Sequence, residues 1–235
     1  MDIHCHILYG LDDGAKSRKM MYAMLRRAAT EGITRIVATP HVTPGVHRFD
    51  REQYATAIQE AAEYCMAEGL GISLYEGCEI LYTSHTSRFL NEGKIPTLAG
   101  TERVLVEFSP DIRYEELCDA LDDLQHNGFL PVVAHVERYR CLAVWPSRAE
   151  KIKQNMEVYF QMNCSSVYKE KSWFTRRFVH WALENRQIDA LGTDSHNTSS
   201  RPANMKKAYK AVKQKYSAGY AKHLTGAAFM FENKE

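Results

Sequence analysis

The chain opens with Asp2-Ile3-His4-Cys5-His6, which a short apolar link joins to Asp12-Asp13-Gly14. Alternate side chains of a β-strand lie on one face, so His4 and His6 point the same way and can bind one metal ion. Alone, two such histidines are a weak signal, because histidines with ordinary structural roles show the same spacing. The rest of the chain strengthens it, since strand-like runs repeatedly end in a residue that can bind a metal.

Six further strand-like runs follow, and helical patterns separate them. The additional strands are expected at residues 35–39, 72–80, 103–108, 130–135, 157–163 and 188–193. The main helices are expected at 17–31, 50–69, 114–127, 147–155, 172–185 and from 202 onward. Strands alternating with helices form βαβ units, and right-handed crossovers between seven such units favour a closed parallel barrel. We expect one α/β domain over residues 1–235, a length at which single barrels are common.

The composition excludes several classes of protein. The 30 basic and 29 acidic residues give a net charge of +1, and basic residues cluster only in twos and threes, so no nucleic-acid or anionic-membrane footprint is evident. No apolar run approaches the roughly 20 residues of a membrane span, and the N-terminus lacks the features of a signal peptide. We expect a soluble, cytoplasmic protein without membrane insertion.

The six cysteines are scattered along the chain and lack C-x-x-C spacing, which argues against a zinc ribbon or a disulfide framework. They are expected to be reduced thiols. No cysteine is followed by arginine at the sixth position, so the C-x5-R pattern of cysteine-dependent phosphatases is absent. Any hydrolysis of phosphate esters by this chain would therefore proceed without a thiolate.

The ends of the expected strands carry residues that can bind metals. Active sites of α/β barrels lie at the C-terminal ends of the strands. The metal-capable residues at these ends are His4, His6, His41, Glu79, Glu107, His135, Asp194 and His196. Any one of them is more often an ordinary polar residue at a barrel rim, but six of seven strand ends carry such a residue. Nitrogen and carboxylate ligands without thiolates suit Mn, Fe or Zn and do not choose among them.

With these residues assembled, the sequence resembles the polymerase and histidinol phosphatase (PHP) superfamily. Within it, the chain is similar to the manganese-dependent protein-tyrosine phosphatases of the bacterial capsule type, CpsB and YwqE. The resemblance runs nearly from end to end. The blocks that carry it are residues 2–6, 12–17, Gly77-Cys78-Glu79-Ile80, Val106-Glu107-Phe108-Ser109, 134–139 and Thr193-Asp194-Ser195-His196-Asn197.

The resemblance implies a distorted (β/α)7 TIM-like barrel with three divalent metal ions, in this family manganese. The first ion would be held by His4, His6, Glu79 and Asp194. The second, bridged by Glu79, would be held by Glu107 and His135. The third would be held by Asp13, His41 and His196. Arg138 and Arg201 would bind the phosphate, whereas without the family either arginine reads more often as a solvated or ion-paired rim residue.

Two neighbouring acids and one loop have no assigned role. We expect Asp12 and Glu137 to support the ligands or to lie in loops. The segment 42–49 varies among relatives and does not decide which phosphoprotein is recognised.

The charges favour a phosphate-ester substrate. Four ligand carboxylates offset only part of the six positive charges of three divalent ions, and two arginines add to the surplus. We hypothesise that hydroxide held by the metals attacks phosphorus in line. The phenolate of phosphotyrosine, whose conjugate acid has a pKa of about 10, needs only a weak general acid to leave.

The family implies a phosphotyrosine protein substrate, a bacterial tyrosine autokinase of exopolysaccharide or capsule synthesis. One alternative is a small-molecule phosphatase of the histidinol-phosphate type, which the residues Asp13 and Glu107 disfavour. Another is a non-catalytic, metal-stabilised module that binds a phosphorylated kinase, but every ligand position is intact. A nuclease role lacks an evident basic track. The oligomeric state is left open.

Overall fold

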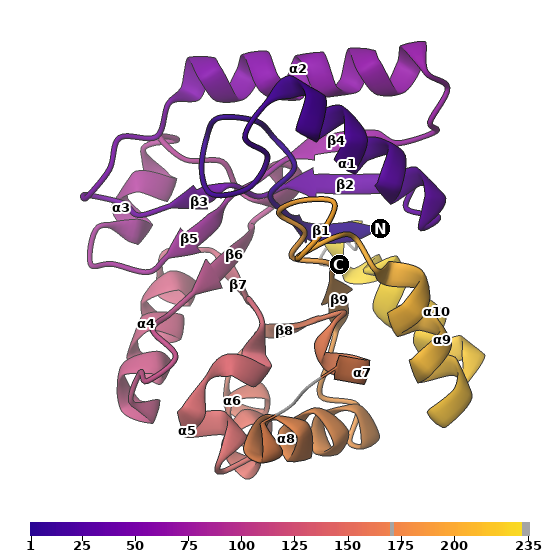
Figure 1. The fold of residues 1–235 in the computed structure, drawn as a ribbon. Coiled ribbons are helices and arrows are strands. Elements are labelled where there is room, and N and C mark those ends of the chain that lie inside the picture. The colour runs from indigo at the N-terminus through magenta and orange to yellow at the C-terminus, as the bar shows by residue number, and fades with distance from the viewer. Residues whose placement is uncertain (170–171, 232–235) are drawn as a thin grey trace.

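The computed structural model describes residues 1–169 and 172–231 and shows parallel strands that curl around a common interior, with the helices outside (Figure 1). The strands are β1 (Asp2–Cys5), β2 (Arg35–Ala38), β3 (His41–Val42), β4 (Ser73–Glu76), β5 (Glu79–Leu81), β6 (Arg103–Glu107), β7 (Leu130–Val133), β8 (Tyr159–Asn163) and β9 (Ala190–Gly192). The longer helices are α1 (Arg18–Thr30), α2 (Arg51–Ala67), α4 (Tyr114–His126), α6 (Ser147–Asn155), α8 (Trp173–Glu184), α9 (Met205–Lys215) and α10 (Ala218–Gly226). The short helices are α3 (Thr86–Asn91), α5 (Arg140–Ala143) and α7 (Ser166–Lys169).

The strands form two parallel sheets, one in the order β1-β2-β4 and the other in the order β3-β5-β6-β7-β8-β9. Backbone hydrogen bonds connect the end of β1 to the segment after β9, from the N–H of His6 to the carbonyl of Ser195 over 2.9 Å and from the N–H of Asp194 to the carbonyl of His4 over 2.8 Å. The predicted α/β class with parallel strands is confirmed. The strand count differs, because the described residues form nine strands in two sheets and not seven strands in one.

One extra strand, β3, lies just beyond the strand expected at 35–39, and the other arises because the strand expected at 72–80 is interrupted. Pro40 follows β2 and cannot donate to a sheet ladder, so β3 begins only at His41 and pairs in the other sheet. Gly77 separates β4 from β5, and a Cβ at this position would lie 2.6 Å from Cγ1 of Val37. The buried hydroxyl of Tyr54 in α2 accepts from the N–H of Gly77 over 2.8 Å and donates to its carbonyl over 3.0 Å. The backbone groups freed by the interruption are thus satisfied by a helix residue.

The expected helix starts are confirmed at two N-caps. The side chain of Ser17 accepts from the N–H of Met20 ahead of α1, and that of Asp50 accepts from the N–H of Gln53 ahead of α2. None of the described helices is both long and apolar enough to cross a membrane.

The interior between the strands is apolar at the end opposite the metal-capable residues. Buried side chains from five strands meet the C-terminal turn there: Ile3, Val37, Leu105, Val132, Ala190, Phe229 and Met230. Burial of this cluster fixes the strands relative to one another. The polar side chains at the carboxyl ends of the strands are held on this rigid base.

Candidate metal centre

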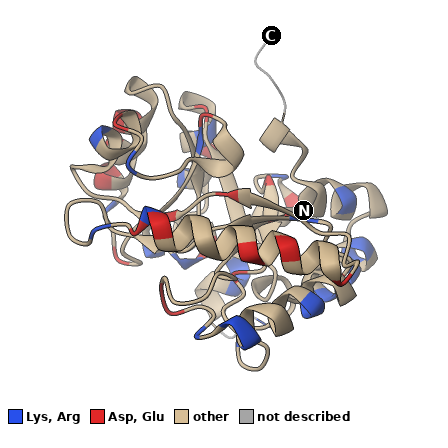
Figure 2. Cartoon of the chain, turned by 90° about the horizontal axis from the view of Figure 1, so that it is seen from above, with Lys and Arg blue, Asp and Glu red and all other residues tan. Residues whose placement is uncertain are grey.

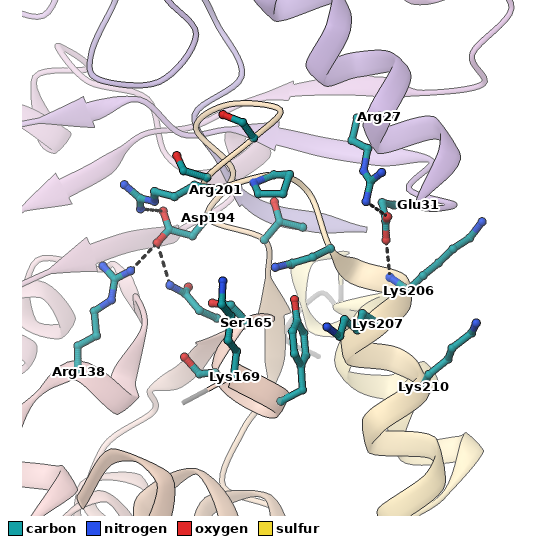
Figure 3. Close-up of a pocket in the computed structure, with 18 residues that line it drawn as sticks. Arg27, Glu31, Arg138, Ser165, Lys169, Asp194, Arg201, Lys206, Lys207 and Lys210 are labelled. Atoms are coloured by element: carbon teal, nitrogen blue, oxygen red, sulfur yellow. Dashed lines mark hydrogen bonds and ion pairs between the residues drawn. The ribbon is translucent and has the colours of Figure 1, made fainter. Parts of the chain in front are cut away.

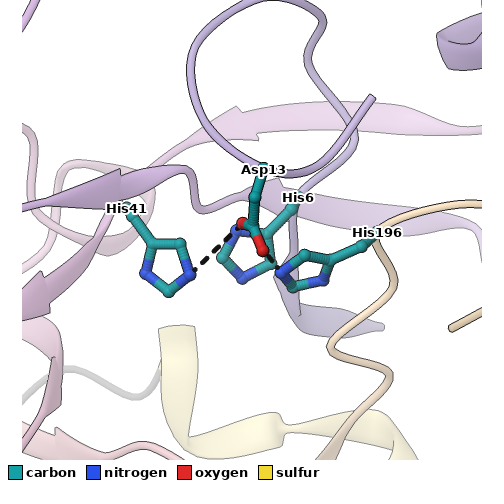
Figure 4. A group of neighbouring side chains, drawn as sticks. All are labelled: His6, Asp13, His41 and His196. Atoms are coloured by element: carbon teal, nitrogen blue, oxygen red, sulfur yellow. Dashed lines mark ion pairs between the residues drawn. The ribbon is translucent and has the colours of Figure 1, made fainter. Parts of the chain in front are cut away.

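All nine residues that the sequence predicts as ligands converge in one cluster, although His41 and Glu79 are the first residues of β3 and β5 and do not end strands. They form four overlapping groups in which the possible ligand atoms lie within 4.8 Å of one another. The groups are His6, Asp13, His41 and His196; His4, His6 and Asp194; His4, Glu79 and His135; and His41, Glu79 and Glu107. Figure 4 shows the first group, in which Asp13 faces His41 and His196. The expected neighbourhood of the strand ends is therefore present.

Glu79 lies at the centre of the cluster. Its Oε2 lies 3.1 Å from Nε2 of both His4 and His6, and its Oε1 lies 2.8 Å from Nε2 of His135. Burial acts to raise the pKa of Glu79, but the charge of His4 and hydrogen bonds from the surrounding histidines hold that pKa well below its usual range. A buried ionised carboxylate with both oxygens among histidines has the geometry of a bridging ligand.

Hydrogen bonds orient His4 of β1 and His6, which directly follows that strand. Nδ1 of His4 lies 2.9 Å from Oε1 of Gln161, and Nδ1 of His6 lies 2.7 Å from Oδ2 of Asp12. These acceptors favour a proton on Nδ1 and leave Nε2, the nitrogen that faces the cluster, available for a metal. The two Nε2 atoms lie 3.2 Å apart, as expected for histidines on one face. Asp12 therefore supports a predicted ligand.

His196 carries an observation that fits a metal. Its Nδ1 lies 3.0 Å from the carbonyl oxygen of Asp194, whereas its buried Nε2 has no hydrogen-bond partner among the described residues. That Nε2 lies 3.2 Å from Oδ1 of Asp13. A buried nitrogen that contacts a carboxylate without forming a hydrogen bond is costly unless another group binds it. A cation between His196 and Asp13 would satisfy both atoms.

The glycine of the Asp12-Asp13-Gly14 block is required by close packing. A Cβ on Gly14 would lie 2.2 Å from the carbonyl oxygen of His6 and 2.6 Å from its Cβ. The N–H of Gly14 also donates to Oδ1 of Asp12 over 2.8 Å. The absence of a side chain at this position lets the loop fold back on His6 and bring Asp13 to the cluster.

Two predicted ligands have a left-handed backbone. The φ angle is 33° at His135 and 51° at Asp194, a region that costs non-glycine residues free energy. Each residue lies two positions after the last residue of a strand, β7 or β9, where the turn changes the direction of the side chain. Backbone strain of this kind concentrates at functional sites.

The two predicted phosphate ligands share one carboxylate. Arg138 donates through Nη2 to Oδ2 of Asp194 over 2.7 Å, and Arg201 donates through Nη2 to Oδ1 over 2.7 Å. Burial acts to raise the pKa of Asp194, but the charges of His4 and Arg138 lower it below the usual range. Both arginine side chains remain partly exposed, at 43% and 39%, so an anion can reach them.

Sequence reasoning missed two polar residues of β8. Oε1 of Gln161 accepts from the N–H of His135 over 2.8 Å in addition to facing His4, and Nδ2 of Asn163 donates to Oδ2 of Asp194 over 2.8 Å. Gln161 also donates to Oδ1 of Asn163 over 3.1 Å. The strand end that lacks a strong ligand thus orients the ligands of its neighbours. The available signal was two amides at alternate positions of one strand, which places both on one face.

Glu137 lies apart from the cluster. It is buried and accepts from the N–H of Asn163 over 3.1 Å and from the hydroxyl of Ser166 over 2.7 Å. Burial raises the pKa of Glu137 above its usual value. It supports the turn after β7 and β8 and touches no predicted ligand directly.

Two cavities open beside the cluster. One, of about 720 Å³, is lined by Arg138, Asp194 and Arg201, and the other, of about 660 Å³, is lined by Asp13, His41 and much of the segment 42–49. His47 lines the second cavity and His85 is exposed, and neither belongs to a metal-capable group. The cluster is therefore accessible to a substrate from two sides.

Comparisons with known proteins agree over the whole chain. The family model for capsular polysaccharide synthesis, CpsB/CapC, matches residues 1–230. The tyrosine-protein phosphatase CpsB of Streptococcus pneumoniae is 32% identical over 229 residues, covering 95% of this chain and 94% of that protein. The tyrosine-protein phosphatase YwqE of Bacillus subtilis is 29% identical over 231 residues, covering 96% and 88%.

Solved structures extend the likeness to three dimensions. A structure from a study of YwqE from Bacillus subtilis and CpsB from Streptococcus pneumoniae, described as unique metal-dependent tyrosine phosphatases, superposes with a TM-score of 0.88 at 26% identity, covering 100% of this chain and 95% of that one. Histidinol phosphate phosphatase of Lactococcus lactis shares the fold, with a TM-score of 0.56 at 14% identity, 96% of this chain and 97% of that one. This chain belongs to the CpsB/CapC family.

Proposed function

We propose that this chain, a tyrosine-protein phosphatase by family, hydrolyses phosphotyrosine on a bacterial tyrosine autokinase and thereby regulates capsular or exopolysaccharide synthesis. The observation that carries the proposal is the pair of arginines at a metal-capable cluster. Arg138 and Arg201 both contact Asp194, which belongs to one of the four groups. Cationic forks beside a metal site form a receptor for a phosphate dianion.

Three divalent ions, manganese in the first instance and iron or zinc as alternatives, would occupy the cluster. His4, His6, Glu79 and Asp194 would hold the first, Glu79 with Glu107 and His135 the second, and Asp13, His41 and His196 the third. Nitrogen and carboxylate donors suit these metals. Four carboxylates leave a surplus of about two positive charges when three divalent ions are bound, which favours an anionic substrate.

The side chains of the chain itself position the substrate. When bound, the metals would supply hydroxide at neutral pH for attack on phosphorus. Arg138 and Arg201 would transfer their hydrogen bonds from Asp194 to the phosphate oxygens and stabilise the charge that develops there. Gln161 and Asn163 would keep His4 and Asp194 in place while the arginines move. The phenolate, with a conjugate-acid pKa of about 10, would leave with little protonation.

The proposal extends to the whole chain. The nine strands would represent a distorted (β/α)7 barrel in which Pro40 and Gly77 each divide one strand, and residues 1–235 would form a single phosphatase domain. The near-neutral charge of +1 is compatible with a cytoplasmic enzyme that meets its kinase in solution.

The deciding experiment is metal analysis of the purified protein together with hydrolysis of a phosphotyrosine peptide, with and without added manganese. We expect bound divalent metal and manganese-stimulated release of phosphate. Faster turnover of histidinol phosphate than of the peptide would assign the small-molecule reaction instead. Binding of a phosphopeptide without hydrolysis of it or of a chromogenic aryl phosphate would indicate a non-catalytic module and contradict the proposal.

A further inference from the structure

The cavity of about 720 Å³ extends from the two arginines to α9, and seven of the eighteen residues that line it are basic (Figure 3). Arg138 and Arg201 lie at one end, and the lysines of the first turns of α9 lie at the other. The basic residues that line it are Arg27, Arg138, Lys169, Arg201, Lys206, Lys207 and Lys210. We call this cavity the basic cleft.

The acidic side chains of the basic cleft are already engaged. Two of its lining residues are acidic, Glu31 and Asp194. Asp194 accepts hydrogen bonds from both Arg138 and Arg201. Glu31 lies 2.8 Å from Nη2 of Arg27 and accepts from the backbone N–H of Lys206 over 2.9 Å. Among the described residues that line the cavity, seven basic and two acidic side chains leave a surplus of five positive charges.

This concentration of charge contrasts with the remainder of the molecule. The whole chain carries a net charge of +1, and both signs occur on elements all around it (Figure 2). Charges of one sign gathered in a cleft focus the electrostatic field and attract groups of the opposite sign. The sequence shows no continuous run of basic residues, because those of the basic cleft come from segments far apart along the chain, among them α1, α7 and α9.

The lysines of α9 that line the basic cleft form no ion pair with a carboxylate of residues 1–169 or 172–231. Lys207 and Lys210 are exposed, and within the described part of the chain no carboxylate lies at ion-pair distance from either ammonium group. Nζ of Lys207 lies 4.3 Å from the ring centroid of Tyr168, which places it against the side of the basic cleft. Positions 206, 207 and 210 fall within about one helical turn, so their side chains serve one face of α9.

We propose that the basic cleft binds anionic side chains that flank the phosphotyrosine, so that the enzyme prefers peptides with aspartate, glutamate or a second phosphotyrosine near the scissile phosphate. The inference rests on the proposed function. It follows from continuity, because one cavity contains both the arginines and the lysines. A phosphotyrosine held by Arg138 and Arg201 would direct the adjoining peptide, at about 3.3 Å per residue, along the lysines.

The test compares peptides of equal length that carry one phosphotyrosine. One has neutral flanks, two have three aspartates on either the N-terminal or the C-terminal side, and a fourth has a second phosphotyrosine. The variant is Lys206→Gln, Lys207→Gln and Lys210→Gln combined. The control is Lys213→Gln with Lys215→Gln, which removes two charges against three, and losses are compared per charge removed; these lysines lie on the same helix outside the basic cleft.

We expect the triple variant to raise KM for the anionic peptides about 5- to 30-fold at low salt while kcat is unchanged, because exposed ion pairs contribute to binding before and during the reaction alike. The difference is expected to narrow with added salt. Turnover of the neutral peptide and of a chromogenic aryl phosphate, and all rates of the control variant, are expected to stay at wild-type values. Preference for the aspartate peptides assigns carboxylates, and preference for the doubly phosphorylated peptide alone assigns phosphate; either result supports the basic cleft.

Equal KM values for neutral and anionic peptides in the wild-type enzyme would overturn the inference and leave the proposed function standing. Equal losses of affinity in the triple variant and in the control variant would also overturn it, since removing lysines anywhere on this helix would then have the same effect. Failure of the wild-type enzyme to hydrolyse any aryl phosphate with manganese would instead contradict the proposed function. In that case, fluorescence anisotropy with the same peptides decides the matter, and equal affinities of the triple variant and the wild type would overturn binding at the basic cleft.

Discussion

Nη2 of Arg138 lies 2.7 Å from Oδ2 of Asp194, which joins a predicted phosphate ligand to a predicted metal ligand. A phosphate dianion would compete with this carboxylate for the guanidinium group, while a metal ion would compete with the guanidinium group for the carboxylate. The contact therefore holds Arg138 beside the metal cluster until phosphate binds the guanidinium group and a metal ion binds the carboxylate. Arg201 donates to the other oxygen of the same carboxylate, so one metal-capable residue holds both arginines at the cluster.

Replacement of Arg138 by alanine tests this arrangement. We expect Arg138→Ala to lower kcat/KM for an aryl phosphate about 10²- to 10³-fold with manganese present, because a charge-assisted contact to the transferring phosphoryl group is lost. Arg138→Lys is the matched variant, and it is expected to recover only part of the rate since lysine lacks the planar fork. Steady-state kinetics provides the measurement. Retention of near wild-type kcat/KM in Arg138→Ala would exclude the assigned role.

Gln161 is predicted to position the ligands without touching substrate. Gln161→Leu removes the acceptor for Nδ1 of His4 and for the N–H of His135, and the side chain is fully buried. We expect metal affinity to fall about 10- to 100-fold, because partners of this kind orient metal-bound histidines. Titration against a competing chelator measures the change. Gln161→Glu retains the acceptor and is expected to bind metal more tightly than Gln161→Leu, and the reverse order would contradict the positioning role.

The strand-end rule explains why the sequence predicted the cluster. Glu107 and His135 end or follow a run of buried apolar residues, and His4 and Glu79 lie near the ends of predicted strands, so their convergence requires only parallel strands with a common direction. The end of the second strand before Pro40 was predicted, whereas β3 beyond it and the break at Gly77 were not. Pairing of β3 and β5 in a separate sheet depends on contacts with Tyr54, which comes from a helix elsewhere in the chain.

The supporting residues and the basic cleft escaped prediction for a related reason. An amide such as Gln161 has no distinctive chemistry until its neighbours across the sheet are known. The lysines of α9 likewise look like an ordinary solvated helix face in the sequence. Only the packing of α9 beside the turn that carries Asp194 and Arg201 makes them part of one cavity.

His6 is predicted to be indispensable for metal retention. His6 belongs to two of the metal-capable groups, so His6→Ala should remove bound metal and activity together. The control is His126→Ala, since His126 is exposed on α4 and lies outside the cluster. Elemental analysis of both variants, alongside kinetics, provides the measurement. Full metal content with full activity in His6→Ala would contradict the ligand assignment.

Metal binding is expected to strengthen as pH rises. Burial acts to lower the pKa of His6, but hydrogen bonds to Asp12 and Glu79 raise it to about 10, and bonds to Glu107 and Glu79 similarly raise the pKa of His135 to about 9 despite its burial. Groups with raised pKa values hold protons at neutral pH, and a metal must displace them. Apparent affinity should therefore increase between pH 6 and pH 8, by up to about tenfold per pH unit for each proton released. Titrations at several pH values that gave one constant affinity would refute this expectation.

The thiols are not expected to take part in the reaction. All six cysteines are free, and burial raises the pKa of the Cys5 and Cys164 thiols well above the usual value and that of Cys141 to about 11. Thiols with raised pKa values are protonated at neutral pH and are poor nucleophiles, so they cannot serve as the phosphate acceptor. We expect iodoacetamide at pH 7 to leave kcat/KM within about twofold of the untreated enzyme, while a chelator abolishes activity. Mass spectrometry identifies the labelled positions, and inactivation that tracks the labelling of a single cysteine would point to a thiolate mechanism in place of the metal-dependent one.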